Sequence, residues 1–248
     1  MIDYEVGADG IAVIAWNMTD RSMNVLNEAS VATFGERVAA AIADPAVKGI
    51  VVTSKKRDFL AGADLTELGH GADARTLTAF AQRFHALLRS LEKSGKPACA
   101  AINGTALGGG YEIALACHRR IAADLPKTEI GLPEVTIGLL PGGGGTQRLP
   151  RLIGIRNALP LLLEGKKLDP KKALAAGLVD EVVPAERLID AAKAWLLGDG
   201  LKSAVQPWDK KGFSIPGGGN SLSSGFRNIF SGSNTMVRAN GYGNYPAP

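Results

Sequence analysis

The chain has 248 residues, of which 46% are hydrophobic and 21% charged, which is typical of a soluble protein with one large domain, with or without an appendage. The net charge is +4, aromatic residues make up 6%, and the Lys and Arg residues are scattered, which argues against a nucleic-acid groove. The chain shows no secretory signal and no apolar run long enough to span a bilayer, so we expect a cytoplasmic protein.

Hydrophobic spacing predicts strands and helices in alternation, which is typical of an α/β fold. Apolar runs predict strands at 11–16, 48–53 and 98–102. Helical spacing predicts helices at 27–43, from near residue 64, and at 76–92, 153–165, 171–177 and 188–197. After Ser203 the chain becomes rich in Gly, Ser, Asn and Pro, so we expect a domain over 1–200 and a loop-rich linker over 201–248.

Two segments of the chain echo each other. GIVVTSKKRDFLAGADLTEL and ACAAINGTALGGGYEIAL both run from a strand through a loop and a glycine into a helix. Two such units could bring two helix N-termini, with their unpaired backbone N–H groups, to one ligand oxygen. The simpler alternative is that the glycines only permit tight turns.

Two acids accompany the second glycine-rich turn. Glu112 lies in the first turn of the predicted helix, where helical spacing places it with Gly109, Leu115 and Ala116 on an apolar face. Glu134 follows in the compact phrase GLPEVTIGLLPGGGG. Burying a carboxylate is costly unless it has partners or a task, so this pair predicts proton transfer beside a site that stabilises negative charge.

Nucleotide-binding motifs do not fit these glycines. No G-x-G-x-x-G occurs within residues 104–115, and Glu112 would place a negative charge where a pyrophosphate should bind. Thr146-Gln147 follows Gly142–Gly145 where a P-loop would need Lys-Ser/Thr. We expect this glycine run to be a flexible turn that packs close to Glu134.

The cysteines and histidines do not form a predicted metal site. Cys99 and Cys117 lie in apolar runs and are expected to be buried, reduced thiols. His70, His85 and His118 show no metal-ligand spacing with the cysteines or with one another.

Three motifs resemble those of the enoyl-CoA hydratase/isomerase (crotonase) family: FLAGADLTEL, AAINGTALGGGYEIALAC and IGLPEVTIGLLPGGGGTQRLPRLIG. The resemblance covers roughly residues 1–197 and implies a crotonase-like α/β spiral of ββα repeats with additional C-terminal helices. The family's trimerising helices are not recognisable after Gly200, which leaves the oligomeric state open. QPWDKKGFSIPGG and GNYPAP resemble the connection between the hydratase/isomerase and dehydrogenase parts of the family's multifunctional fatty-acid β-oxidation members. That resemblance implies a fragment whose full-length protein carries a C-terminal 3-hydroxyacyl-CoA dehydrogenase part, with a thiolase subunit as a candidate partner.

The resemblance also implies roles for individual residues. Glu112 and Glu134 would hold a water between them, and the backbone N–H groups of Ala63 and Gly109 would form an oxyanion hole for a thioester carbonyl. The Ala61 carbonyl would face the adenine of coenzyme A, and further contacts with coenzyme A are expected from Gly62, Asp64 and Gly108. No metal and no separate cofactor is expected, because coenzyme A enters as part of the substrate.

The activity implied is hydration of 2-trans-enoyl-CoA to 3-hydroxyacyl-CoA in fatty-acid β-oxidation. The presence of both acids matches the hydratase pattern, since simple isomerases of the family often lack the counterpart of Glu112; a 3-enoyl to 2-enoyl-CoA isomerase activity stays open. Alternatives with the same fold are an acyl-CoA thioesterase or dehalogenase, and a non-catalytic CoA- or RNA-binding relative. For the segment after Ser203, the alternative to a linker is closure over the acyl tunnel, packed by Trp208, Phe213, Phe226 and Phe230.

Overall fold

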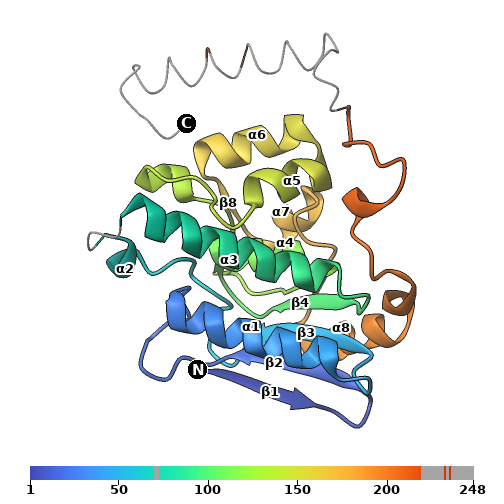
Figure 1. The fold of residues 1–248 in the computed structure, drawn as a ribbon. Coiled ribbons are helices and arrows are strands. Elements are labelled where there is room, and N and C mark those ends of the chain that lie inside the picture. Colours follow the sequence, from blue (N-terminus) through green and yellow to red (C-terminus); the bar gives the residue numbers. More distant parts are fainter. Residues whose placement is uncertain (70–72, 219–231, 233–234, 236–248) are drawn as a thin grey trace.

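A largely parallel β-sheet forms the centre of the computed structural model, which describes residues 1–69, 73–218, 232 and 235 (Figure 1). Within these residues the large sheet has six strands in the order β1-β2-β3-β4-β6-β9. Only β1 runs antiparallel to its neighbour, and the other adjacent strands are parallel. The strands are β1 (Ile2–Val6), β2 (Ile11–Trp16), β3 (Gly49–Ser54), β4 (Ala98–Ile102), β6 (Arg119–Ala123) and β9 (Glu181–Val183).

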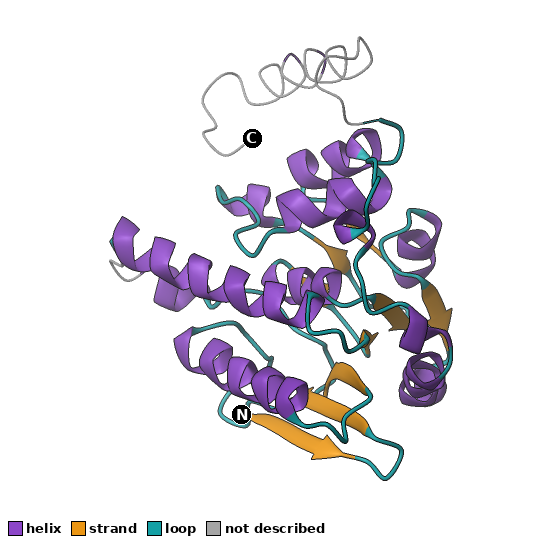
Figure 2. Ribbon diagram, turned by 45° about the vertical axis from the view of Figure 1, so that its right-hand side comes forward, coloured by secondary structure: helices purple, strands orange, loops and turns teal. Residues whose placement is uncertain are grey.

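Helices cover both faces of this sheet. Alternate residues of each strand point to opposite faces, so the inner strands β2, β3, β4 and β6 contribute apolar side chains to two cores. On one face, Val51 and Cys99 pack with the apolar side of α8 (Leu188–Leu197). On the other face, Val52 and Ala100 belong to the larger core beneath α1 (Glu28–Ala43), α3 (Ala74–Glu92) and α4 (Gly109–Ala116). Figures 1 and 2 show α1 and α3 side by side on that second face. The buried runs thus explain why these strands read as nearly continuous apolar segments.

A smaller sheet accompanies the large one, and its strands also follow one another in chain order. It contains β5 (Ala106–Leu107), β7 (Ile130–Gly131) and β8 (Lys167–Leu168). Single bridges from Leu26 to Ala63 and from Leu60 to Ala106 continue the same row toward the N-terminus. Each of β2, β3, β4 and β6 is therefore followed by a short extended segment that pairs with its equivalent in a neighbouring unit. The predicted α/β spiral of repeats is confirmed, and the echo between two segments extends to further units.

The predicted helices are present with bounds shifted by a few residues. The described elements also include α2 (Leu65–Gly69), α5 (Gly145–Ile153), α6 (Ile155–Glu164), α7 (Pro170–Ala175) and four 3-10 turns: η1 (Glu134–Ile137), η2 (Ala185–Arg187), η3 (Asp199–Lys202) and η4 (Pro207–Asp209). Helix α5 was not predicted, because it begins inside the glycine run and contains Pro150. Both features ordinarily disfavour a helix.

The described part of the chain after residue 200 contacts the body of the domain. Gln206 is buried and donates to the carbonyls of Ala116 and Cys117 at the end of α4, at 2.9 and 3.2 Å. Asp209 accepts hydrogen bonds from Arg89 on α3. Trp208 and Phe213 are half-buried, whereas Phe226 and Phe230 lie outside the described residues. In the described ranges, no helix combines the length and apolarity that a membrane crossing requires.

Candidate functional site

Two glycine-rich turns meet at the edge of the small sheet. Leu107 donates its N–H to the carbonyl of Leu60 at 3.0 Å, which fixes the turn before α4 against the turn before α2. Gly62 and Gly108 have φ values of +105° and +52°, which non-glycine residues rarely adopt. A Cβ on Gly62 would lie 3.1 Å from the Leu107 carbonyl oxygen and 3.7 Å from the Gly109 nitrogen. Glycine is therefore needed at this contact both for conformation and for space.

The turns present two backbone donors to one pocket. Gly109 is the first residue of α4, whose first N–H groups have no partner within the helix. Ala63 bridges Leu26 but does not use its own N–H to do so. In the part of the chain that the structure describes, neither of these two N–H groups has a hydrogen-bond acceptor. Both residues line the same cavity, so the two donors and the positive end of α4 can stabilise a developing negative charge there.

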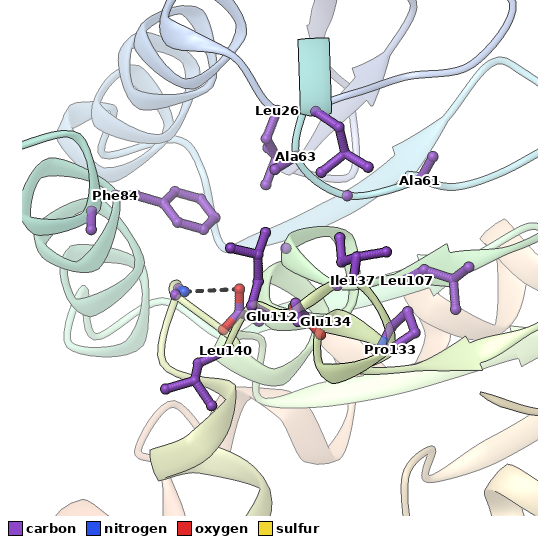
Figure 3. Close-up of a pocket in the computed structure, with 18 of the residues that line it drawn as sticks. Leu26, Ala61, Ala63, Phe84, Leu107, Glu112, Pro133, Glu134, Ile137 and Leu140 are labelled. Carbon is purple, nitrogen blue, oxygen red and sulfur yellow. Dashed lines mark hydrogen bonds between the residues drawn. The ribbon is translucent and has the colours of Figure 1, made fainter. Parts of the chain in front are cut away.

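Glu112 is held at the floor of this cavity by the glycine run. Its side chain is buried, and Oε2 accepts the Gly143 N–H at 2.9 Å (Figure 3). Oε1 accepts the Gly145 N–H at 2.7 Å. A Cβ on Gly143 would lie 2.6 Å from Oε2, so a side chain at that position would displace the carboxylate. The expectation of a flexible turn packed against Glu134 is corrected here: the glycines are fixed by hydrogen bonds to Glu112, because the backbone is the donor that a buried carboxylate needs.

Burial raises the pKa of Glu112 above its ordinary value. The hydrogen bonds from Gly145 and Gly143 and the positive charge of Arg148 act in the opposite direction, since each favours the ionised form. Glu112 is thus a buried acid with a fixed geometry, whose protonation is governed by burial on one side and by hydrogen bonds and a positive charge on the other.

Glu134 lies close by in a different environment. It begins η1, its side chain is half-buried, and its Oε1 would lie 3.2 Å from a Cβ built on Gly108. Its Oε2 is buried and has no hydrogen-bond partner among the described residues. Burial and the negative charge of Glu112 raise the pKa of Glu134 to about 7. A carboxyl with a free oxygen and such a pKa is suited to giving and taking protons at neutral pH.

The cavity around the two acids has a volume of about 400 Å³ and a predominantly apolar wall. Figure 3 shows Leu26, Ala63 and Phe84 facing the two glutamates across it. Its mouth is rimmed by exposed apolar side chains, namely Leu65, Leu77, Ile137, Leu139 and Leu140. The site therefore combines two acids and two N–H donors with a cavity wall that suits an apolar ligand.

The structure brings most of the predicted site residues together. The ones that line the cavity are Ala61, Gly62, Ala63, Gly108, Gly109, Glu112 and Glu134. Asp64 does not line it: its buried carboxylate pairs with Arg21 at 2.7 Å, and a hydrogen bond from Thr66 is the main cause of its lowered pKa. A contact between Asp64 and coenzyme A therefore stays a prediction.

Sequence reasoning missed several residues of the site. The donors Gly143 and Gly145 were visible only as part of a glycine run, and the apolar walls from Leu26 and Phe84 come from helices or turns distant in sequence. Among the described residues no group of His, Cys, Asp and Glu could hold a metal ion, while His70 lies outside them. Cys99 and Cys117 are buried and free, as expected.

Comparison with known proteins identifies the family. The model of the family described as "Enoyl-CoA hydratase/isomerase" matches residues 7–198. The chain belongs to the enoyl-CoA hydratase/isomerase family. Similar solved structures of this family include the enoyl-CoA hydratase of Bacillus anthracis, with 33% identity and a TM-score of 0.73 over 79% of this chain and 74% of that chain. Another is the enoyl-CoA hydratase of Thermoplasma volcanium, with 33% identity and a TM-score of 0.71 over 80% and 75% of the two chains.

Curated relatives of this enoyl-CoA hydratase/isomerase family member include longer proteins. The fatty acid oxidation complex subunit alpha of Shewanella putrefaciens is 42% identical over 245 residues, which cover 97% of this chain and 34% of that protein. The chain thus spans about a third of the length of the curated relatives it matches. The family resemblance and the crotonase-like fold, predicted from the three motifs, are confirmed.

Proposed function

We propose that this chain hydrates 2-trans-enoyl-CoA thioesters to 3-hydroxyacyl-CoA, as a step of fatty-acid β-oxidation. The observation that carries the proposal is the pairing, in one cavity, of two glutamates in unlike environments with two unpaired backbone N–H groups. Hydration needs both features, because it builds enolate charge on the thioester oxygen and moves two protons.

In the proposed reaction, the N–H groups of Ala63 and Gly109 donate to the thioester oxygen. Ionised Glu112 takes a proton from water as the water oxygen bonds to C3, and the C2=C3 electron pair moves toward the thioester. Protonated Glu134 then gives its proton to C2. The product has gained one water, and proton exchange between the two acids and solvent restores the starting state.

The unlike environments of the acids support this division of roles. A pKa of about 7 leaves Glu134 partly protonated at neutral pH, as a proton donor to carbon requires. Glu112 receives two backbone hydrogen bonds, which favour its ionised form and fix its orientation. Placing two carboxyl groups in one pocket separates their protonation, as in other acid pairs.

A 3-enoyl to 2-enoyl-CoA isomerase activity is proposed as a second reaction at the same site. It needs only removal of a proton at C2 and its return at C4, with enolate charge held by the same two N–H donors. Glu134, with its free Oε2, can perform both transfers. The family description names both activities, which supports this proposal.

The proposed substrate supplies its own coenzyme A, so no metal or separate cofactor enters the scheme. Ala61, Gly62 and Gly108 line the part of the cavity that would receive the thioester.

Because the curated relatives are alpha subunits of fatty acid oxidation complexes, we propose a C-terminal 3-hydroxyacyl-CoA dehydrogenase part and a thiolase subunit as partners of the full-length protein. The free, buried thiols of Cys99 and Cys117 agree with a reducing compartment, and we propose the cytoplasm.

The test is hydration of crotonyl-CoA by the pure chain, followed as loss of the enoyl-thioester absorbance. We expect multiple turnovers without release of free coenzyme A thiol, because hydration keeps the thioester whole. Thiol release would instead favour the thioesterase alternative. Adding NAD should produce no stoichiometric NADH, because the sequence lacks a dinucleotide-binding motif.

A further inference from the structure

A buried ion pair contacts the loop of residues 142–145, whose N–H groups donate hydrogen bonds to Glu112. Glu92, the last residue of α3, and Arg148, on α5, are 1% and 5% exposed. Arg148 Nε donates to Glu92 Oε1 at 2.7 Å, and Arg148 Nη2 donates to Glu92 Oε2 at 3.1 Å. This two-point contact fixes the plane of the guanidinium group.

The remaining end of the guanidinium holds the loop itself. Arg148 Nη1 donates to the Gly143 carbonyl at 2.7 Å, while the N–H of the same residue donates to Glu112 Oε2. Gly143 therefore accepts a hydrogen bond from Arg148 through its carbonyl and donates one to the Glu112 carboxylate through its N–H. Gly144 leaves room for this hydrogen bond. It has a φ of +101°, and a Cβ there would lie 2.3 Å from Arg148 Nη1.

Stability alone does not account for this arrangement. Burying two charges costs much of what their attraction returns, and apolar residues of similar size often stabilise a core equally well. The contacts that only an arginine can make are the two to Glu92 together with the one to Gly143, because its donors form a rigid planar fork. The three contacts together fix the position of the backbone at Gly143.

We propose that Arg148, oriented by Glu92, is a positioning residue for Glu112, and that it sets the angle at which Glu112 meets the attacking water. The inference rests on the proposed function for its kinetic readout. Glu92 Oε2 also accepts from Arg89 at 2.5 Å, and Arg89 pairs with Asp209 at 2.9 Å, so the same network reaches the segment after residue 200.

The experiment compares Arg148→Lys and Glu92→Gln with a matched control, Arg151→Lys. Arg151 lies on the same helix but hydrogen-bonds to Gln147 and not to the loop. We expect Arg148→Lys and Glu92→Gln to lower kcat for hydration by about 10²-fold, with KM little changed, because a displacement of about 1 Å in a catalytic group has effects of that size. The isomerase activity, which does not use Glu112, should fall by less than about tenfold, and Arg151→Lys should leave both activities near those of the wild type.

A double variant separates positioning from general structural support. If Arg148 acts through Glu112, then Arg148→Lys should cause no further loss of hydration in a Glu112→Gln background. Equal losses of both activities, additive losses in the double variant, or unchanged hydration in Arg148→Lys would each overturn the proposal.

Amide hydrogen exchange over residues 142–147 supplies a readout that does not depend on activity. We expect faster exchange at Gly143 and Gly145 in Arg148→Lys than in the wild type and in Arg151→Lys, because the loop loses its carbonyl anchor. Unchanged exchange would contradict the positioning role. A wild-type chain that did not hydrate crotonyl-CoA would refute the proposed function, while the exchange comparison would still decide whether Arg148 holds the loop.

Discussion

The backbone N–H of Gly143 donates a 2.9 Å hydrogen bond to Oε2 of Glu112, across 31 residues of sequence. With the bond from Gly145, it makes Glu112 the fixed acid of the pair. The carboxyl group of Glu134 is less constrained, because its Oε2 has no hydrogen-bond partner among the described residues. The two carboxyl groups thus differ in freedom as well as in solvation, and this difference underlies the roles proposed for them.

Adjacent glycines at the start of α4 should respond differently to substitution. A Cβ on Gly109 would meet the end of a flexible side chain, Leu26 Cδ1 at 2.3 Å, inside the cavity. We expect Gly109→Ala to reduce hydration by about 10²-fold with a small change in Tm, because the new methyl group and the displaced leucine crowd the thioester. Activity assays and thermal unfolding on the same preparation measure both.

The matched control is Gly110→Ala. There a Cβ would lie 2.5 Å from the carbonyl oxygen of Leu60, which is backbone and cannot move aside. We expect this variant to lose stability, by about 1–3 kcal/mol, because overpacking forces a backbone shift. A large Tm loss in Gly109→Ala would show that this glycine serves only the turn.

The raised pKa of Glu134 has a consequence for stability. Its pKa rises from near 4.5 to about 7 on folding, so ionisation is harder in the folded chain than in the unfolded chain. The contribution of Glu134 to folding stability therefore falls as pH rises from 4.5 to about 7, and stays lower above that range. Glu134→Gln is neutral throughout, so its gain over the wild type should be larger at about pH 8 than at about pH 5, by at most about 3 kcal/mol. Denaturant unfolding at the two pH values measures the gain; an equal or smaller gain at high pH would contradict this electrostatic account.

The charge of Glu112 should be visible in the pH dependence of isomerisation. Glu134 must be ionised to remove the proton at C2, so kcat/KM for a 3-enoyl-CoA should rise with pH, with a midpoint near 7 in the wild type. Burial is the main cause of that raised pKa and the negative charge of Glu112 is the second, so Glu112→Gln should shift the midpoint to lower pH. A midpoint that stays the same or rises would show that the two acids are not coupled.

Much of the fold could be predicted because its determinants are local. The buried strands β3 and β4 read as apolar runs, and the spacing of Val31, Phe34 and Val38 marks the buried side of α1. Helix α5 could not be predicted, because its first residue, Gly145, is placed by a hydrogen bond to Glu112 from a distant part of the chain. Tertiary contacts there override the local signals for a turn.

The site shows the same division. Glu112 and Glu134 stood out because acids within apolar sequence are unusual. Arg148 and Glu92 could not be recognised in the same way, since charged residues on helices are usually solvated. Only the packing of α3 against the rest of the domain shows that these two are buried and paired. Pairing between positions 56 residues apart is a property of the fold.

The central claim, that Glu134 moves the proton at C2 while Glu112 acts on water, is tested most directly by measuring crotonyl-CoA hydration and 3-enoyl-CoA isomerisation in Glu112→Gln and Glu134→Gln. Glutamine keeps the shape of the side chain and removes its ionisable proton, and such groups commonly contribute about 10²–10⁴-fold to rate. We predict that Glu134→Gln loses both activities and that Glu112→Gln loses hydration while keeping much of the isomerase activity. Near-normal hydration by Glu134→Gln would contradict the mechanism.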